Sequence, residues 1–258
     1  MNHMQNKARN AIWALALMIF LSGCASNYGW GWFVVNPTTA QGRNNLDFLI
    51  GGLGNTIAVS LCAMALSIGI GLAVGMMGMA KSRLLRGAAR VYVEAFRSVP
   101  ILVMLLWVFY GLPVLIGLRL DVFTAAVLAL ALCDSAFEAE IFRGGIQSIE
   151  RGQHEAADSI GLTWRHKMRF IILPQAIRRI LPPLGNQFVY VTKMSSLASV
   201  IGLGELTRQA NELVVTLYRP LEIYTILVLE YMALILIISW GVRRLEARLG
   251  SDESKGRR

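Results

Sequence analysis

Long uncharged stretches alternate with short basic ones along most of the chain. Residues 48–80 contain no charged side chain, and a helix fits inside them, because about 20 apolar residues are needed to cross a bilayer. The same criterion, applied along the chain, predicts five spanning helices at about 56–79, 98–118, 122–142, 180–203 and 223–242. The pattern therefore predicts an all-α membrane protein.

Composition and charge agree with this class. Of the 258 residues, 55% are hydrophobic and only 16% are charged, whereas charged residues make up about 25% of an ordinary soluble domain. The net charge is +9, but the basic residues gather mainly in segments 81–90, 143–179 and 243–258, at the ends of apolar stretches. Lys and Arg concentrate in the cytoplasmic loops of membrane proteins, so these segments are expected in the cytoplasm. This distribution also argues against a nucleic-acid partner.

The first predicted span carries a row of small residues. Ser67, Gly71 and Gly75 are spaced four residues apart and share one helix face. Small residues on one face let another helix approach closely, so this row is expected to form a helix contact.

Carboxyl groups inside the third span are candidate binding residues. Asp134 and Glu138 share one helix face, whereas Glu140 is rotated from Glu138 by about 200°. Ionisable groups in a membrane are costly and usually face a cavity or a partner. Arg143 is a candidate ionic partner for Glu140 or Glu138. Arg97 and Glu94 are a second candidate pair at the inner surface, and snorkelling of these side chains at the interface is the alternative.

The fourth span contains a lysine near its middle. Pro182-Pro183 and Gly185 are expected to break this span early. An unpaired ammonium group is disfavoured at Lys193, so its side chain is expected to meet a carboxyl group of the third span or the carboxylate of a substrate. The substrate-path candidates are Asp134, Glu138, Asn186, Lys193, Ser195 and Ser196. Purely structural pairing among them is the alternative.

Catalytic and metal sites are not indicated. Cys24, Cys62 and Cys133 lack the spacing of a metal site or a disulfide framework, and the last two are expected to be buried small apolar residues. Residues 75–82 superficially resemble a phosphate loop, but they lack the Gly-Lys pair and the preceding strand of a nucleotide site.

The cytoplasmic loop 143–179 has a distinctive internal spacing. Its marked positions are Glu155, Ala156, Ala157, Gly161, Ile171, Leu173 and Pro174. Residues 155–159 favour a helix, Gly161 can adopt the positive φ of a turn, and residues 164–172 resume a basic amphipathic pattern. Pro174 is expected to limit the second helix. One interpretation is a basic loop that lies on anionic headgroups.

This spacing (EAA, three residues, Gly, nine residues, Ile-x-Leu-Pro) resembles the EAA loop of permease subunits of bacterial ABC importers. The resemblance covers about residues 53–249 and implies a type I-like permease core of five transmembrane helices with a cytoplasmic coupling loop, after an N-terminal hydrophobic segment. In that family the loop is a short helix-turn-helix that docks on a separate ATPase subunit. Glu155 is then expected to cap or salt-bridge the docking helix, Gly161 to permit the turn, and Pro174 to fix its exit.

Two further segments resemble the polar amino-acid branch of this family. They are AEIFRGGIQSIERGQHEAA at 139–157 and LPPLGNQF at 181–188. The branch usually has an acidic or amide residue after the lysine, and Met194 stands there instead. Together with FRSVP at 96–100, these segments look most like acidic amino-acid permeases. Glutamate or aspartate is the expected substrate, with basic amino acids or glutamine as alternatives.

The resemblance also implies the partners of the chain. They are an ATP-binding cassette ATPase subunit, a periplasmic solute-binding protein and a second permease subunit, identical or not, all working at the bacterial inner membrane among its lipids. ATP and magnesium would be held by the ATPase subunit. The chain itself is expected to bind no cofactor and to be a non-catalytic transport subunit.

Residues 1–25 have the form of a targeting segment. Lys7 and Arg9 precede an apolar stretch at 11–23, which is short for a span and typical of a signal sequence. The residues LSGC at 21–24 resemble a lipobox, which would leave Cys24 lipidated. A retained signal anchor is favoured, because few permeases of the family carry a lipidated end. Either outcome places residues 26–52 in the periplasm, and the tail 250–258 is expected in the cytoplasm.

Two other classes of function compete with the importer. An ion-coupled secondary transporter would use the membrane carboxylates as ion sites, but it leaves the EAA spacing unexplained. A lipid-anchored structural protein is suggested by Cys24, but five further apolar spans contradict it. The sequence therefore favours the permease subunit of an ATP-driven importer.

Overall fold

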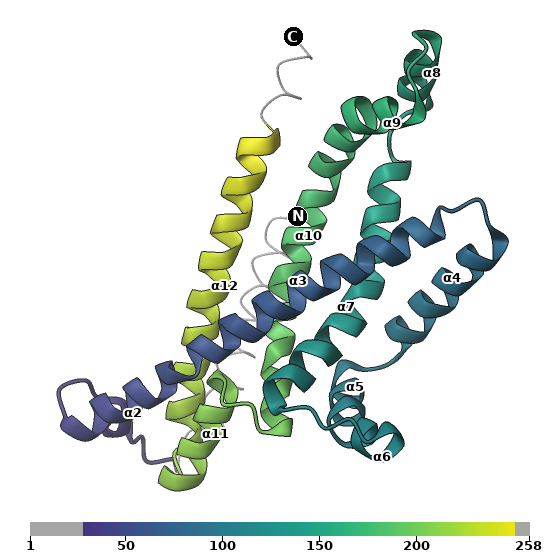
Figure 1. Cartoon of the computed structure of the whole chain (residues 1–258). Helices are drawn as coiled ribbons and strands as arrows, with labels where there is room; N and C mark the ends of the chain where they lie inside the picture. The colour runs from purple at the N-terminus through teal and green to yellow at the C-terminus, as the bar shows by residue number, and fades with distance from the viewer. Residues whose placement is uncertain (1–27, 251–258) are drawn as a thin grey trace, which may run out of the picture.

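The computed structural model describes residues 28–250, and regular structure within them is entirely helical. The elements are η1 (Trp32–Val35), α2 (Ala40–Gly51), α3 (Leu53–Gly78), α4 (Arg83–Ser98), α5 (Ile101–Leu106), η2 (Trp107–Gly111), α6 (Leu112–Ile116), α7 (Val122–Gln147), α8 (Arg151–Ser159), α9 (Trp164–Lys167), η3 (Met168–Ile172), α10 (Leu173–Met194), η4 (Ser195–Ile201), α11 (Leu206–Leu217) and α12 (Pro220–Gly250). Figure 1 shows α8 and α9 projecting at one end of the long helices, with α2 and α11 at the other end. The targeting segment 1–25 with Cys24, and the tail after residue 250, lie outside the described residues.

Several of the described helices have the length and composition of membrane spans. Three helical stretches qualify by both criteria: Ala40–Gly78, Val122–Gln147 and Pro220–Ala247. A fourth is added if α4 and the α5–α6 segment, which are bent by 100°, count as one span. The long helix α10 is more polar, because it carries Arg178, Arg179 and Lys193. The all-helical architecture agrees with the expectation, and the number of five spans stays a prediction.

The most extensive helix contact joins α3 and α7. The predicted row of small residues forms it, since Ser67, Gly71 and Gly75 are all buried. A Cβ atom on Gly71 would lie 2.7 Å from Cβ of Glu138 and 2.9 Å from the carbonyl oxygen of Ser135. The two helices therefore approach more closely than any larger residue would permit.

The second predicted span, 98–118, is not one straight helix. α4 ends at Ser98, and the chain then bends by 100° into α5 and α6. Proline disfavours the helical conformation of the residue before it, and Val99, which precedes Pro100, has extended backbone angles of −92° and 126°. The Val-Pro pair thus explains the bend.

Two π-helical turns correct the expected role of the prolines. η2 and η3 are π turns of five residues each, and a Leu-Pro pair follows each of them, at 112–113 and at 173–174. Proline lacks an amide hydrogen and crowds the carbonyl group four residues earlier. A π turn accommodates this defect within a continuous helix. Pro174 therefore does not end the second helix of the loop, which continues through η3 into α10.

The expected break in the fourth span is also absent. Pro182 and Pro183 lie inside α10, which continues to Met194. Gly185 has a packing role, because a Cβ atom there would lie 2.2 Å from Cγ1 of Val242 on α12. The glycine lets α10 and α12 pack together.

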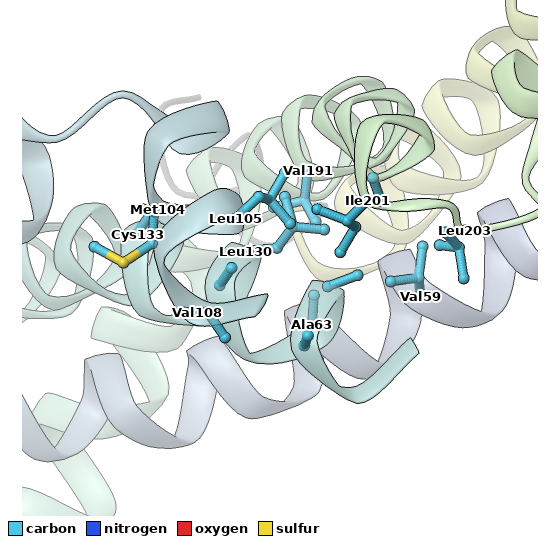
Figure 2. Packing of buried hydrophobic residues seen from close by; sticks show 14 residues of the cluster. Val59, Ala63, Met104, Leu105, Val108, Leu130, Cys133, Val191, Ile201 and Leu203 are labelled. Atoms are coloured by element: carbon cyan, nitrogen blue, oxygen red, sulfur yellow. The ribbon is translucent and has the colours of Figure 1, made fainter. Parts of the chain in front are cut away.

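The main apolar cluster lies among α3, α5, η2, α7, α10 and η4 (Figure 2). Buried members from these elements are Val59, Ala63, Leu105, Val108, Leu130, Val191 and Ile201. Cys133 is buried in this cluster as predicted, whereas Cys62 is exposed and the prediction for it is wrong. Cys62 lies beside Leu61 and Leu66 on a face of α3 that is also exposed.

The first described residues are fastened to the start of α12. The buried carboxylate of Glu222 accepts hydrogen bonds from the hydroxyl of Tyr28 at 2.6 Å and from the backbone amide of Gly31. The bond to Glu222 raises the pKa of Tyr28. Arg219 donates to the carbonyl oxygen of Gly29 at 2.5 Å. These contacts hold the segment before α2 in place.

Candidate functional site

The elbow, which we define as residues 151–172 (α8, a turn, α9 and η3), projects from one end of the molecule (Figure 1). The amide of Gly161 donates to the carbonyl of Asp158 at 3.0 Å, and that of Leu162 to the carbonyl of Ala157 at 3.1 Å. These two bonds form a Schellman motif at the end of α8. Gly161 has a φ of +73°, which confirms its predicted role in the turn.

Side chains join the two arms of the elbow. The ammonium group of Lys167 donates to both carboxylate oxygens of Asp158, at 2.7 and 2.9 Å. The hydroxyl of Thr163 accepts from the backbone amide of His166 and caps α9. The carboxylate of Glu155 is exposed and has no hydrogen bond or ion pair to any described residue. The expected capping or salt bridge by Glu155 therefore does not occur among residues 28–250.

Large apolar side chains are exposed on the elbow. Ile160 is 73% exposed, and Trp164 and Phe170 are each 63% exposed. The basic residues Arg165 and Arg169 lie beside them in the sequence and are exposed as well. Contiguous exposed apolar surface on a soluble face commonly marks an interaction site.

The base of the elbow is packed against the bundle. Ile172 and Ala176 are fully buried, and they form a cluster with Phe142 of α7. Ile171 is partly buried against the same cluster. Among the other motif residues, Ala157 is buried, and the exposed ones are Glu155, Ala156, Gly161, Leu173 and Pro174. The motif thus combines anchoring residues with residues that face outward.

Asp134 and Glu138 are brought together inside the bundle, where they are 3% and 0% exposed. Asp134 accepts hydrogen bonds from the hydroxyl of Ser67 on α3, at 3.0 Å, and from the side-chain amide of Gln187 on α10. Neither carboxyl oxygen of Glu138 has a hydrogen-bond partner among residues 28–250. The pair links three helices and does not reach the surface of the chain.

Gln187 was missed by the sequence analysis, which selected its neighbour Asn186. One residue along a helix is a rotation of about 100°, so Gln187 faces the buried carboxyl group while Asn186 is exposed. The sequence alone does not distinguish the two, because the carboxyl group that accepts from Gln187 lies on α7.

Of the two partners expected for Lys193, the structure contradicts the first, since Lys193 does not pair with Asp134 or Glu138, and the carboxylate of a substrate stays a prediction. Lys193 is exposed, and so are Asn186 and Tyr190, which lie seven and three residues before it. These spacings place all three on one face of α10. The hydroxyl groups of Ser195 and Ser196, at the start of η4, donate to the carbonyl groups of Thr192 and Lys193 at the end of α10, each at 2.8 Å.

The two arginines near the inner surface have other partners than the expected ones. Arg97 pairs with Glu140 on α7 and not with Glu94, and its guanidinium lies 5.1 Å from the ring centre of Phe137. Arg143 donates to the side chain of Gln147 at 3.4 Å. Helix α4 packs beside α7, and this contact, which no local spacing could reveal, selects the partner of Arg97.

Comparisons with known proteins agree with this architecture. Residues 65–251 match the family described as binding-protein-dependent transport system inner membrane component. The glutamine transport system permease protein of Escherichia coli strain K12 is 38% identical over 205 residues, covering 79% of this chain and 94% of that protein. The arginine transport system permease protein of Bacillus subtilis strain 168 is 33% identical over 208 residues, covering 81% and 95%.

Solved structures show the same fold. A crystal structure of an amino acid ABC transporter with histidines is 39% identical and has a TM-score of 0.75, covering 80% of this chain and 96% of that chain. An inward-facing methionine ABC transporter shares the fold, with a TM-score of 0.69 at 22% identity, over 80% and 98% of the chains.

The helical bundle and these matches define a component of a membrane transport system. The chain belongs to the family of inner membrane components of binding-protein-dependent transport systems, as a permease subunit of an amino-acid ABC importer. It is a non-catalytic, multi-pass protein of the inner membrane.

Proposed function

We propose that this chain moves a polar amino acid across the inner membrane and that the elbow is the surface on which a separate ATPase subunit docks. The geometry of the elbow is the observation that carries the proposal. The Schellman turn and the Asp158–Lys167 pair fix its shape, while Ile160, Trp164 and Glu155 face outward without a partner in the described chain.

The elbow is also connected to the membrane helices in a way that suits coupling. α9, η3 and α10 form one continuous helix, and Ile172 packs the base of the elbow against Phe142 of α7. A displacement of the elbow would therefore be passed to α10. ATP binding to the partner would favour one of two arrangements of the helices, and substrate binding the other.

The orientation follows from the charge distribution. Figure 1 shows the C-terminal end of α12 on the same side as the elbow. Both carry basic residues, with Arg243 and Arg244 on α12, so this side faces the cytoplasm. The opposite end, with α2 and α11, would then receive a periplasmic solute-binding protein.

The exposed polar face of α10 is the proposed substrate path. Lys193 has no ion pair in the described chain and lies in a helix of the bundle. An ammonium group cannot face lipid without a large cost, so it faces water or a second permease subunit, where Asn186 and Tyr190 would accompany it. The buried Asp134–Glu138 pair is then a support of this path and not its lining.

The identity of the amino acid is a further part of the proposal. The permeases named above serve glutamine and arginine transport. They support an amide or cationic side chain at least as well as the expected glutamate or aspartate. Glutamine is therefore the first substrate to test, with glutamate, aspartate and arginine as competitors.

Charge reversal on the elbow tests the docking. We expect Glu155→Lys to abolish uptake in cells while the amount of protein in the membrane is unchanged. Glu150→Lys is the matched control, because Glu150 is exposed and caps no helix with its side chain. Normal uptake in Glu155→Lys, or solute transport by the purified chain alone along an ion gradient, would contradict the proposal.

Removal of the lysine tests the path. Lys193→Met should reduce uptake while basal ATP hydrolysis by the assembled complex continues. Lys193→Arg keeps the charge and should retain part of the uptake. Loss of Lys193→Met from the membrane would instead show that the lysine is structural.

A further inference from the structure

A cavity of about 600 Å³ lies between α3, α4 and α7, and no residue of the elbow lines it. Its charged lining consists of Arg86, Arg90, Arg97, Arg143, Glu94 and Glu140. Glu140 is already paired with Arg97. The remaining lining therefore contains three arginines and one glutamate, and it favours an anion.

Two of these arginines have no carboxylate partner in the described chain, although Arg143 donates to the side chain of Gln147 at 3.4 Å. Arg86 donates to the carbonyl groups of Ala80 and Lys81, at 2.8 Å each, and so fixes the loop between α3 and α4. By contrast, Arg90 on α4 and Arg143 on α7 have no carboxylate partner among residues 28–250. They line the cavity from two different helices.

The other face of α4 is apolar. Leu84 and Val91 are 81% and 69% exposed, although the same helix supplies Arg86 and Arg90 to the cavity. A helix that is basic on one face and apolar on the other is typical of the membrane interface. Segment 81–90 lies on the cytoplasmic side in the orientation proposed above.

We propose that the cavity binds the headgroup phosphate of an anionic phospholipid from the inner leaflet, while the apolar face of α4 lies in the surrounding bilayer. Arginine recognises phosphate through charge-assisted, often bidentate hydrogen bonds. Basic pockets between membrane helices on the cytoplasmic side are known to favour anionic headgroups. A lipid held by Arg90 and Arg143 would join α4 to α7 and stabilise the folded bundle, because it binds the folded form.

The experiment measures lipid binding to the full-length chain, purified in neutral detergent. Native mass spectrometry would count retained dioleoylphosphatidylglycerol and dioleoylphosphatidylcholine, and the unfolding temperature would be recorded with each. The test variant is Arg90→Gln/Arg143→Gln, which spares Arg86 and Arg97. The matched control is Arg83→Gln, since Arg83 is exposed on α4 outside the cavity.

We expect phosphatidylglycerol to be retained and to raise the unfolding temperature, with phosphatidylcholine much weaker. The double variant should bind phosphatidylglycerol roughly tenfold or more weakly, and the control should bind as the original chain does. If the double variant does not fold, Arg90→Gln alone should show a smaller loss in the same direction.

Three results would overturn the proposal. The first is an equal preference for phosphatidylglycerol in the original chain and the variants. The second is equal stabilisation by inorganic phosphate or glycerol 3-phosphate, which would indicate a site for free anions. The third is displacement of the lipid by glutamine or glutamate, which would place the cavity in the substrate path. Binding is measured without the ATPase, so failure of the proposed coupling would not affect the result.

Discussion

The α3–α7 contact and the elbow both depend on glycine, but for different physical reasons. Gly71 is required for the missing side chain, because a Cβ atom there would meet Glu138 and the backbone at Ser135. Gly161 has open space around it and is required for its φ of +73°. Gly71 is therefore required by the close packing of a neighbouring helix, whereas Gly161 is required by the conformation of its own backbone.

The α3–α7 contact and the elbow also differ in how firmly they are held. The α3–α7 contact is buried along its length and is shared by two long helices. The turn of the elbow is held by two hydrogen bonds, one cap and one ion pair, and only the base of the elbow is packed against the bundle. Segments with few buried contacts open at lower free energy than the core, so the elbow can adjust while the bundle stays intact.

The largest effect is expected where α3 meets α7. We expect Gly71→Leu to lower the free energy of unfolding by about 3 kcal/mol or more, because the new side chain meets backbone atoms that cannot move aside. The measurement is the fraction of folded protein in detergent during a titration with sodium dodecyl sulfate.

Gly69→Leu is the matched control for this change. Gly69 is exposed on the same helix and a Cβ atom there would meet nothing within 4 Å. Its stability should stay close to that of the original chain. Equal stabilities of the two variants would show that close packing does not explain the role of Gly71, because both changes raise helix propensity alike.

The sequence predicted this contact better than it predicted the partners of charged groups. The row of Ser67, Gly71 and Gly75 follows from helix periodicity alone, and the structure confirms that it is buried. Arg97 has Glu94 nearby in sequence, yet it pairs with Glu140. That choice depends on how α4 packs against α7, and such a tertiary arrangement is not encoded in local spacing.

The backbone of the elbow was likewise predicted only in part from the sequence. The turn at Gly161 was predicted, because a single glycine followed a helix-favouring segment. The continuation of the helix through Pro174 was not predicted, because a π turn depends on the packing of η3 around Ile172. A π turn precedes the Leu-Pro pair at 112–113 and also the one at 173–174. This association between Leu-Pro and a π turn is recognised only when both turns are seen in the structure.

An intermediate effect is expected at the turn of the elbow. Gly161→Val should destabilise the elbow locally by about 2 kcal/mol, because a β-branched residue is strained in the left-handed region. Amide hydrogen exchange in α8 and α9 should accelerate and uptake should fall, while the global unfolding of the bundle changes little. Gly152→Ala is the control, since it lies within α8 with open space around it and should slow exchange slightly.

The smallest effect is expected at the ion pair of the elbow. Asp158 is 60% exposed in its side chain, although Lys167 is 15% exposed, and pairs of this kind contribute less than about 1 kcal/mol. Asp158→Asn should therefore accelerate exchange in the elbow only slightly, and the difference should shrink in high salt because exposed charges are screened. Glu212→Gln removes the exposed Arg208–Glu212 pair on α11 and should leave exchange in the elbow unchanged.

If Asp158→Asn loosened the elbow as much as Gly161→Val, the charge pair would be the main constraint there. The contrast between a packing glycine and a backbone glycine would then no longer describe how the two regions differ.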